Sequence, residues 1–238
     1  MRTEKRPMES FVLSEKDAPY SLEEAYNSIA AELKRVGWPI GGWKVGGSNH
    51  ATCATFDVQT PYYGALLTEE IMSATKAAPC PGYPMVEWKG EVEFALRISA
   101  DGRGYDGWCL ALEMPSSPLG NLPGVGVAAL VADRCGAGAL LLGKIHDGKL
   151  PELEGKKLVL EADGVQLDEA DSSALTAAPE EILAEVLDLL RQHGHTPEAG
   201  QWVATGGVTG CHQLSRAGQL RVTFDGIDML NAVLSDGL

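Results

Sequence analysis

Two glutamates, Glu91 and Glu93, stand one residue apart in a segment whose alternate residues Val92, Phe94 and Leu96 are apolar. This alternation is typical of a strand with one buried face, so both carboxylates should project from the other face. Their like charges disfavour joint ionisation unless water solvates them or a cation lies between them. A hard divalent cation such as Mg²⁺ prefers oxygen ligands of this kind.

A third glutamate, Glu113, interrupts the apolar run 108–114. A charged side chain is costly to bury unless it is paired or coordinates a metal. An amphipathic strand with a solvated face also commonly carries two glutamates, and the doublet alone favours this alternative over a metal site. It does not explain all three acids.

A glycine-rich segment, residues 41–48, contains Lys44. The glycines indicate close approach of the backbone to a neighbour or a ligand, although a tight turn explains them equally well. Lys44 is either a cation beside the acids or a surface lysine that extends past Trp43. The residues alone favour the surface lysine.

Composition limits the classes of partner. The chain has 238 residues, 45% of them hydrophobic, which is enough for a substantial core. Its formal net charge of −14 argues against nucleic acid and against an anionic membrane surface, because both select positive fields. A small-molecule substrate is favoured by elimination.

Cysteine usage and the terminal sequence indicate a reducing cytoplasm. The five cysteines are widely spaced and form no Cys-x-x-Cys pair, so neither a disulfide framework nor a zinc site is predicted. The first residues lack the apolar segment of a signal peptide. The most apolar stretch, 125–143, is interrupted by Asp133, Arg134 and glycines, so we expect a buried helix followed by a strand at 139–143 rather than a membrane span.

The elements around these residues are mostly strands. Ser21 and Glu24 form a capping box that predicts a helix up to Gly37, and a second helix is expected from Pro179 to His193. Strands are expected within 87–112 around a turn at 100–104, at 201–205, at 219–224, and in a hairpin that turns at Asp163-Gly164. Because strands outnumber helices, we predict an α+β fold with a β-rich core.

Five motifs in this order resemble the 2-keto-4-pentenoate hydratase and 4-oxalocrotonate decarboxylase family of the fumarylacetoacetate hydrolase superfamily, over about residues 21–235. They are the glycine-flanked Lys44, Pro61-Tyr62-Tyr63-Gly64, Glu91-Val92-Glu93, Ala111-Leu112-Glu113 and the segment 200–207. Each motif is weak alone, but the ordered set is fairly specific. The resemblance implies one catalytic domain over 1–238, with 1–20 as an N-terminal extension. Its β-rich core would carry an N-terminal helix and one helix in the C-terminal half.

The resemblance also implies a role for individual residues. Mg²⁺ or Mn²⁺ would be bound by the family's three ligands, which match Glu91, Glu93 and Glu113. Lys44 matches the active-site lysine, and burial near a metal should lower its pKa. The substrate carboxylate would be held by a turn that matches Thr205, Gly206 and Gly207.

Substrates would be short 2-oxo acids that react through a metal-bound enolate, whose growing charge the cation stabilises. We therefore expect a hydratase or decarboxylase, and the resemblance adds a homo-oligomer. The alternatives are a tautomerase, isomerase or cyclase with the same enolate chemistry, and a non-catalytic partner subunit. The histidines form no compelling site, and His50 is expected to be an exposed loop residue.

Three positions depart from the family pattern. Tyr62 replaces the usual aspartate after the proline, and Asp57 lies too far upstream to substitute for it. Tyr62 could act as a phenolic proton donor, or the reaction could need no activated water. The interval from Glu93 to Glu113 is short, as if a helical stretch were absent, and Gly207 stands where a serine is common.

Overall fold

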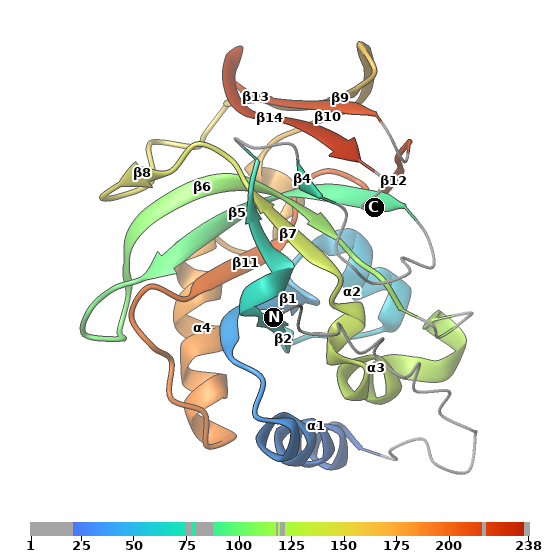
Figure 1. Cartoon of the computed structure of the whole chain (residues 1–238), viewed down its shortest axis with the longest axis vertical. Coiled ribbons are helices and arrows are strands. Elements are labelled where there is room, and N and C mark those ends of the chain that lie inside the picture. The colour runs from blue at the N-terminus through green and yellow to red at the C-terminus, as the bar shows by residue number, and fades with distance from the viewer. Residues whose placement is uncertain are drawn as a thin grey trace, which may run out of the picture.

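The architecture comes from a computed structural model (Figure 1), which describes residues 21–74, 78–79, 88–117, 119, 122–215 and 218–235. The expected extension 1–20 and Cys80 lie outside these residues. The α-helices are α1 (Leu22–Val36), α2 (His50–Phe56), α3 (Leu122–Ala132) and α4 (Pro179–Gln192). The strands are β1 (Ile40–Gly46), β2 (Tyr62–Leu67), β3 (Ile71–Ser73), β4 (Ala78–Pro79), β5 (Lys89–Ile98), β6 (Tyr105–Met114), β7 (Ala139–Leu142), β8 (His146–Asp147), β9 (Leu158–Ala162), β10 (Val165–Ala170), β11 (Trp202–Gly207), β12 (His212–Gln213), β13 (Gln219–Phe224) and β14 (Ile227–Ser235).

The elements that local sequence patterns predict are present in the structure. The Ser21 hydroxyl caps α1 by accepting a hydrogen bond from the Glu24 amide, and Gly37 ends the helix in the left-handed conformation. The β9–β10 hairpin turns at Asp163-Gly164, where both residues have positive φ. The second predicted helix is α4, and it ends at Gln192.

The buried helix expected from the apolar stretch is α3, which is kinked at Gly126 (φ 82°). A 3₁₀ turn, η2 (Arg134–Gly136), follows it and leads into β7. Gly138 permits close packing of this connection, because a Cβ there would overlap the Met114 carbonyl oxygen. The four described cysteines are free thiols.

Two sheets make up the β-rich core, which confirms the α+β class. The larger sheet has the order β2-β1-β11-β5-β6-β7-β3, with β12 beside β5 and β8 beside β6, and the smaller has the order β10-β9-β13-β14-β4. Pairing is mixed, since β1 runs parallel to β11 and β3 to β7. Figure 1 shows the larger sheet strongly curled, with α4 along one side, α1 and α3 below, and the smaller sheet above.

The two faces of β5 differ in character. Val92, Phe94 and Leu96 belong to the main core, and the ring of Phe94 meets Phe224 of the smaller sheet edge-on at 6.2 Å. The other face carries small residues that form a separate apolar cluster, including Ala95 and its neighbours Cys109, Ala111 and Ala204. The glutamates lie on this second face, where small side chains leave their carboxylates room.

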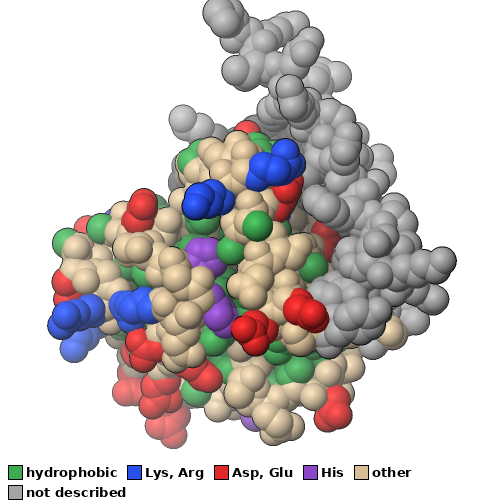
Figure 2. All heavy atoms as spheres, turned by 90° about the horizontal axis from the view of Figure 1, so that it is seen from below, with side chains coloured by type: hydrophobic (Ala, Val, Ile, Leu, Met, Phe, Trp, Pro, Cys, Tyr) green, Lys and Arg blue, Asp and Glu red, His purple; other side chains and the backbone are tan. Residues whose placement is uncertain are grey.

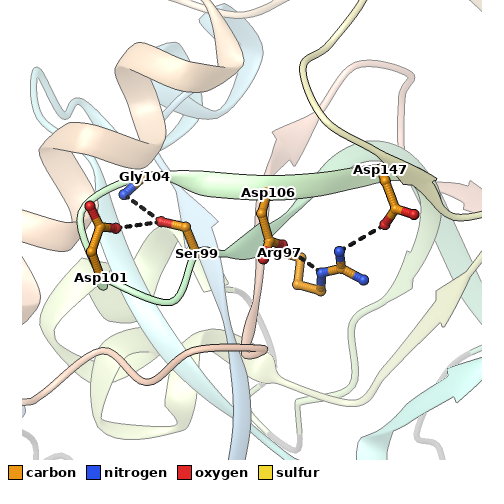
Figure 3. A network of polar contacts seen from close by, with 6 residues as sticks. All are labelled: Arg97, Ser99, Asp101, Gly104, Asp106 and Asp147. Atoms are coloured by element: carbon orange, nitrogen blue, oxygen red, sulfur yellow. Dashed lines mark hydrogen bonds and ion pairs between the residues drawn. The ribbon is translucent and has the colours of Figure 1, made fainter.

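A short turn joins β5 directly to β6, as the short interval between Glu93 and Glu113 predicted. At this end of the hairpin the Ser99 hydroxyl donates to Asp101 and accepts from the Gly104 amide, while Arg97 pairs with Asp106 and Asp147 (Figure 3). The turn lies at the opposite end of the strands from Glu91 and Glu113. It fixes the register that sets these two residues opposite each other.

No helix in the described ranges is both long and apolar enough to cross a bilayer. On the face seen from below in Figure 2, acidic and basic side chains are interspersed around central histidines.

Candidate metal centre

The antiparallel register of β5 and β6 places Glu91 directly opposite Glu113, with Glu93 on the same face. Each glutamate offers an oxygen within 4.8 Å of the oxygens of the other two. Glu93 and Glu113 are only 1% and 0% exposed, while Glu91 is partly exposed. The alternative of a solvated strand face is therefore wrong for this cluster.

Burial raises the pKa of all three carboxylates, and the charge of neighbouring carboxylates adds to the shift at Glu91 and Glu93. Burial and the charge of Glu113 raise the pKa of Glu91 to about 7. Burial, with Glu91 and then Glu113 as the charged neighbours, raises the pKa of Glu93 well above its usual range. Burial also raises the pKa of Glu113, although Lys44 opposes this shift. A cation among these oxygens would remove the repulsion.

Lys44 is buried beside this cluster, with 6% of its surface exposed. Its Nζ atom donates a hydrogen bond to Glu113 Oε1 at 2.8 Å, so the alternative of a surface lysine is wrong. In the metal-free protein the pKa of Lys44 shifts upward, whereas the lowering expected beside a bound metal stays a prediction. Burial does lower it, but the charge and the hydrogen bond of Glu113 outweigh burial and raise the pKa. Lys44 is therefore a fixed ammonium group.

The second carboxylate oxygen of Glu113 supports a cation at this position. Glu113 Oε2 is buried and has no hydrogen-bond partner among the described residues. A buried charged acceptor without a partner is costly. Three convergent carboxylates with one unsatisfied oxygen are a donor set that fits Mg²⁺ or Mn²⁺.

Tyr62 lies at the edge of the same cluster, on the strand next to Lys44. It pairs with Gly46 of β1, and its ring covers that glycine so closely that a Cβ there would lie 2.5 Å from Cζ. The glycine-rich segment is thus a strand with close neighbours and not a tight turn. The Tyr62 hydroxyl makes no hydrogen bond to any described residue, and burial raises its pKa, so it remains protonated.

Strand β11 lies between β1, which carries Lys44, and β5, which carries Glu91 and Glu93. The turn that is predicted to bind substrate belongs to β11, so it lies between these residues. The Thr205 hydroxyl donates to the Phe94 carbonyl at 3.0 Å, and the Gly206 amide donates to Glu93 Oε2 at 2.7 Å. A Cβ at Gly207 would overlap a carboxylate oxygen of Glu91. The Glu91 carboxylate thus occupies the space that the side chain of a serine, common at this position, would need. The binding of substrate by this turn stays a prediction.

Some neighbours of the cluster were not identified from the sequence. Arg134, Cys135 and Gly136 have consecutive positive φ values, and the Arg134 carbonyl oxygen packs so closely on Gly64 that a Cβ there would overlap it. Arg134 makes a bidentate ion pair with buried Glu70, at 2.7 and 2.8 Å. Ionisable residues in the apolar stretch 125–143 were the available signal, because buried charges need partners.

Asp133 and Ser48 are two further buried polar residues that sequence reasoning missed. The Ser117 hydroxyl donates to Asp133 at 2.5 Å, and burial raises the pKa of Asp133 to about 6 despite this bond. Ser48 is fully buried, and its hydroxyl donates to the Thr205 carbonyl at 2.8 Å. His50, by contrast, is exposed as expected, but it is the first residue of α2 and does not lie in a loop.

No protein-family model matches the sequence, and no curated protein matches it. Solved structures do match. One is the 4-oxalocrotonate decarboxylase from Pseudomonas putida G7 complexed with magnesium and adipate, with 21% identity, a TM-score of 0.73, and coverage of 89% of this chain and 85% of that one. A structure of the same enzyme complexed with calcium and acetate has 20% identity, a TM-score of 0.72 and the same coverage.

A third similar structure is the fumarylpyruvate hydrolase from Pseudomonas aeruginosa in complex with Mn²⁺ and pyruvate. It has 15% identity and a TM-score of 0.59, and the match covers 84% of this chain and 91% of that one. At these identities the likeness establishes the fold. It confirms, at that level, the fumarylacetoacetate hydrolase-like architecture that the motifs predicted.

Proposed function

We propose that this protein is a divalent-metal-dependent lyase, a hydratase or decarboxylase, that acts on a short unsaturated 2-oxo acid through its enolate. The observation that carries the proposal is the convergence of three glutamates, two of them fully buried, beside the ammonium group of Lys44. Proteins of the same fold complexed with magnesium and adipate, or with Mn²⁺ and pyruvate, support it.

The residues of the site have separate roles in this proposal. Glu91, Glu93 and Glu113 would hold Mg²⁺ or Mn²⁺, which draws electron density from a coordinated carbonyl and so acidifies the adjacent carbon. Lys44, kept charged by Glu113, would stabilise the negative charge that develops on the substrate oxygen. Thr205, Gly206 and Gly207 would border the substrate carboxylate.

Tyr62 bears on which reaction follows. Its hydroxyl is protonated and free of hydrogen bonds to the described residues, so at neutral pH it can donate a proton but not readily remove one from water. This favours protonation of an enolate carbon, as in decarboxylation, over activation of water. It equally supports our second candidate, a tautomerase, isomerase or cyclase that only relocates a proton.

We further propose that the enzyme is a cytoplasmic homo-oligomer.

Proton NMR in heavy water tests the shared chemistry. Deuterium exchange at the carbon beside the ketone of a simple saturated 2-oxo acid should require Mg²⁺ and should be lost in Glu93→Gln. Carbon dioxide release from an unsaturated 2-oxo diacid would then separate decarboxylation from hydration and isomerisation. Absence of both exchange and product despite bound metal would overturn the proposal in favour of a non-catalytic partner subunit.

A further inference from the structure

Ser48 and Glu93 hold opposite ends of one peptide unit. The Ser48 hydroxyl donates to the Thr205 carbonyl oxygen at 2.8 Å, and the Gly206 amide donates to Glu93 Oε2 at 2.7 Å. This carbonyl and this amide belong to the same planar peptide group, in which the C=O and N–H bonds point in opposite directions. A rotation that breaks one of the two hydrogen bonds therefore misaligns the other.

The backbone around this peptide is suited to that arrangement. Between Ala204 and Gly207, β11 advances three residues while β5 advances only two, from Ala95 to Glu93, so β11 carries a bulge. Gly206 within the bulge has φ 110°, and a Cβ there would overlap the Ser48 hydroxyl. Only glycine allows Ser48 to approach this closely while the amide points toward Glu93.

Hydrogen bonds hold the segments on both sides of this peptide in place. On one side, the Thr176 amide and hydroxyl donate to the Ser48 carbonyl at 2.9 and 3.1 Å, which fixes the backbone of Ser48. On the other side, the Val208 amide donates to the Val92 carbonyl at 2.8 Å, and the Val92 amide donates to the Thr209 hydroxyl at 2.9 Å. The Ser48 hydroxyl holds the carbonyl end of the peptide, and the Thr205 hydroxyl, which donates to the Phe94 carbonyl, holds the side chain beside it.

We infer that Ser48 is a positioning residue of the metal centre, which acts through the 205–206 peptide to orient the Glu93 carboxylate toward a bound cation. The inference rests on the proposed function, because it assigns Glu93 as a metal ligand. Hydrogen bonds in series polarise one another, so the bond from Ser48 also strengthens the amide as a donor. Partners that orient metal ligands typically contribute about 10- to 100-fold to metal affinity.

Ser48→Ala removes the hydroxyl and leaves the backbone contacts of residue 48 with Thr176 in place. Ser99→Ala is the matched control, since it also removes a serine hydroxyl bonded within the chain, but at the far end of the β5–β6 hairpin (Figure 3). Mn²⁺ affinity measured by EPR should fall about 10-fold or more in Ser48→Ala. It should stay within about twofold in Ser99→Ala. Equal affinity in Ser48→Ala and wild type would overturn the inference.

The amide proton of Gly206 gives a second readout in the metal-free protein. Its NMR signal, shifted downfield by the carboxylate, should move upfield in Ser48→Ala and remain in place in Ser99→Ala. A loss of stability alone would not move it. If the wild type binds no Mn²⁺, the proposed function fails, and so does the assignment of Ser48 to a metal centre. If it binds Mn²⁺ but the Gly206 signal is unchanged in Ser48→Ala, only the positioning role fails.

Discussion

Glu91 of β5 and Glu113 of β6 are directly opposed partners in an antiparallel pair, on the face of the sheet that also carries Glu93. Like charges at directly opposed positions destabilise a sheet. Here Glu93 and Glu113 are buried, and the ammonium of Lys44 is bonded to a single carboxylate oxygen, while Lys89 contributes a further positive charge nearby. The arrangement is costly for the metal-free fold and suits a divalent ion.

Glu93→Gln should therefore separate metal binding from stability. The variant keeps an oxygen that can accept from the Gly206 amide but loses a charged ligand, so Mg²⁺ affinity measured by calorimetry should fall by more than about 100-fold. The metal-free variant should be at least as stable as wild type in urea, because the buried amide is neutral without taking up a proton. Glu161→Gln on the exposed face of β9 is the control. Unchanged Mg²⁺ affinity in Glu93→Gln would show that the cluster is not the metal site.

The stability of the folded protein should depend on pH through the ionisation of Glu91. Its pKa is raised from 4.5 to about 7 in the folded protein, so the folded state binds a proton that the unfolded state has released. This contribution to stability is complete below the unfolded pKa and is lost as pH rises through the folded value. The metal-free wild type should accordingly lose stability relative to Glu91→Gln between about pH 4.5 and 7.

Using the difference between the two proteins removes titrations that do not depend on Glu91. Burial lowers the pKa of His193 and His195, which gives the opposite slope near the same pH, but both proteins share it. Thermal unfolding in EDTA across this range is the measurement. Saturating Mg²⁺ should reverse the trend in wild type, because metal binding requires ionised carboxylates. A constant difference across the range would contradict the assignment.

Lys44→Met should destabilise the metal-free protein by about 3–5 kcal/mol at neutral pH, because it leaves Glu113 buried without its cation. Mg²⁺ should recover part of this loss by supplying positive charge to the same carboxylate. Urea unfolding with EDTA and with Mg²⁺ measures both effects. Lys157→Met, which breaks an exposed pair with Asp171, should leave stability nearly unchanged, because water screens exposed ion pairs. A loss in Lys44→Met that Mg²⁺ does not reduce would indicate that the lysine and the metal do not share Glu113.

Tyr62→Phe should slow the reaction without weakening the metal centre. The hydroxyl makes no hydrogen bond to the described residues, so its removal should leave thermal stability and Mg²⁺ affinity nearly unchanged. Loss of a positioned proton donor should reduce deuterium exchange into a 2-oxo acid by about 100-fold or more. Exchange at the wild-type rate in this variant would exclude Tyr62 as the proton donor.

Local patterns in the sequence were sufficient for the elements and for the chemical type of the site. A capping box, an Asp-Gly turn and alternating apolar residues each act over a few residues, so α1, the β9–β10 hairpin and β5 could be predicted directly. Three acids in apolar surroundings indicated a metal site, because buried carboxylates need a compensating positive charge. The ordered motifs indicated the fold that the solved structures share.

Only the tertiary structure decided which groups meet. Lys44 reaches Glu113 because β11 lies between β1 and β5, an arrangement that no local pattern encodes. The same contact raises the pKa of Lys44 in the metal-free protein, since the shift depends on which carboxylate lies beside a buried ammonium. The link from Ser48 through the 205–206 peptide to Glu93 joins three distant segments. Such a link depends on packing and peptide geometry in three dimensions, so the sequence alone could not reveal it.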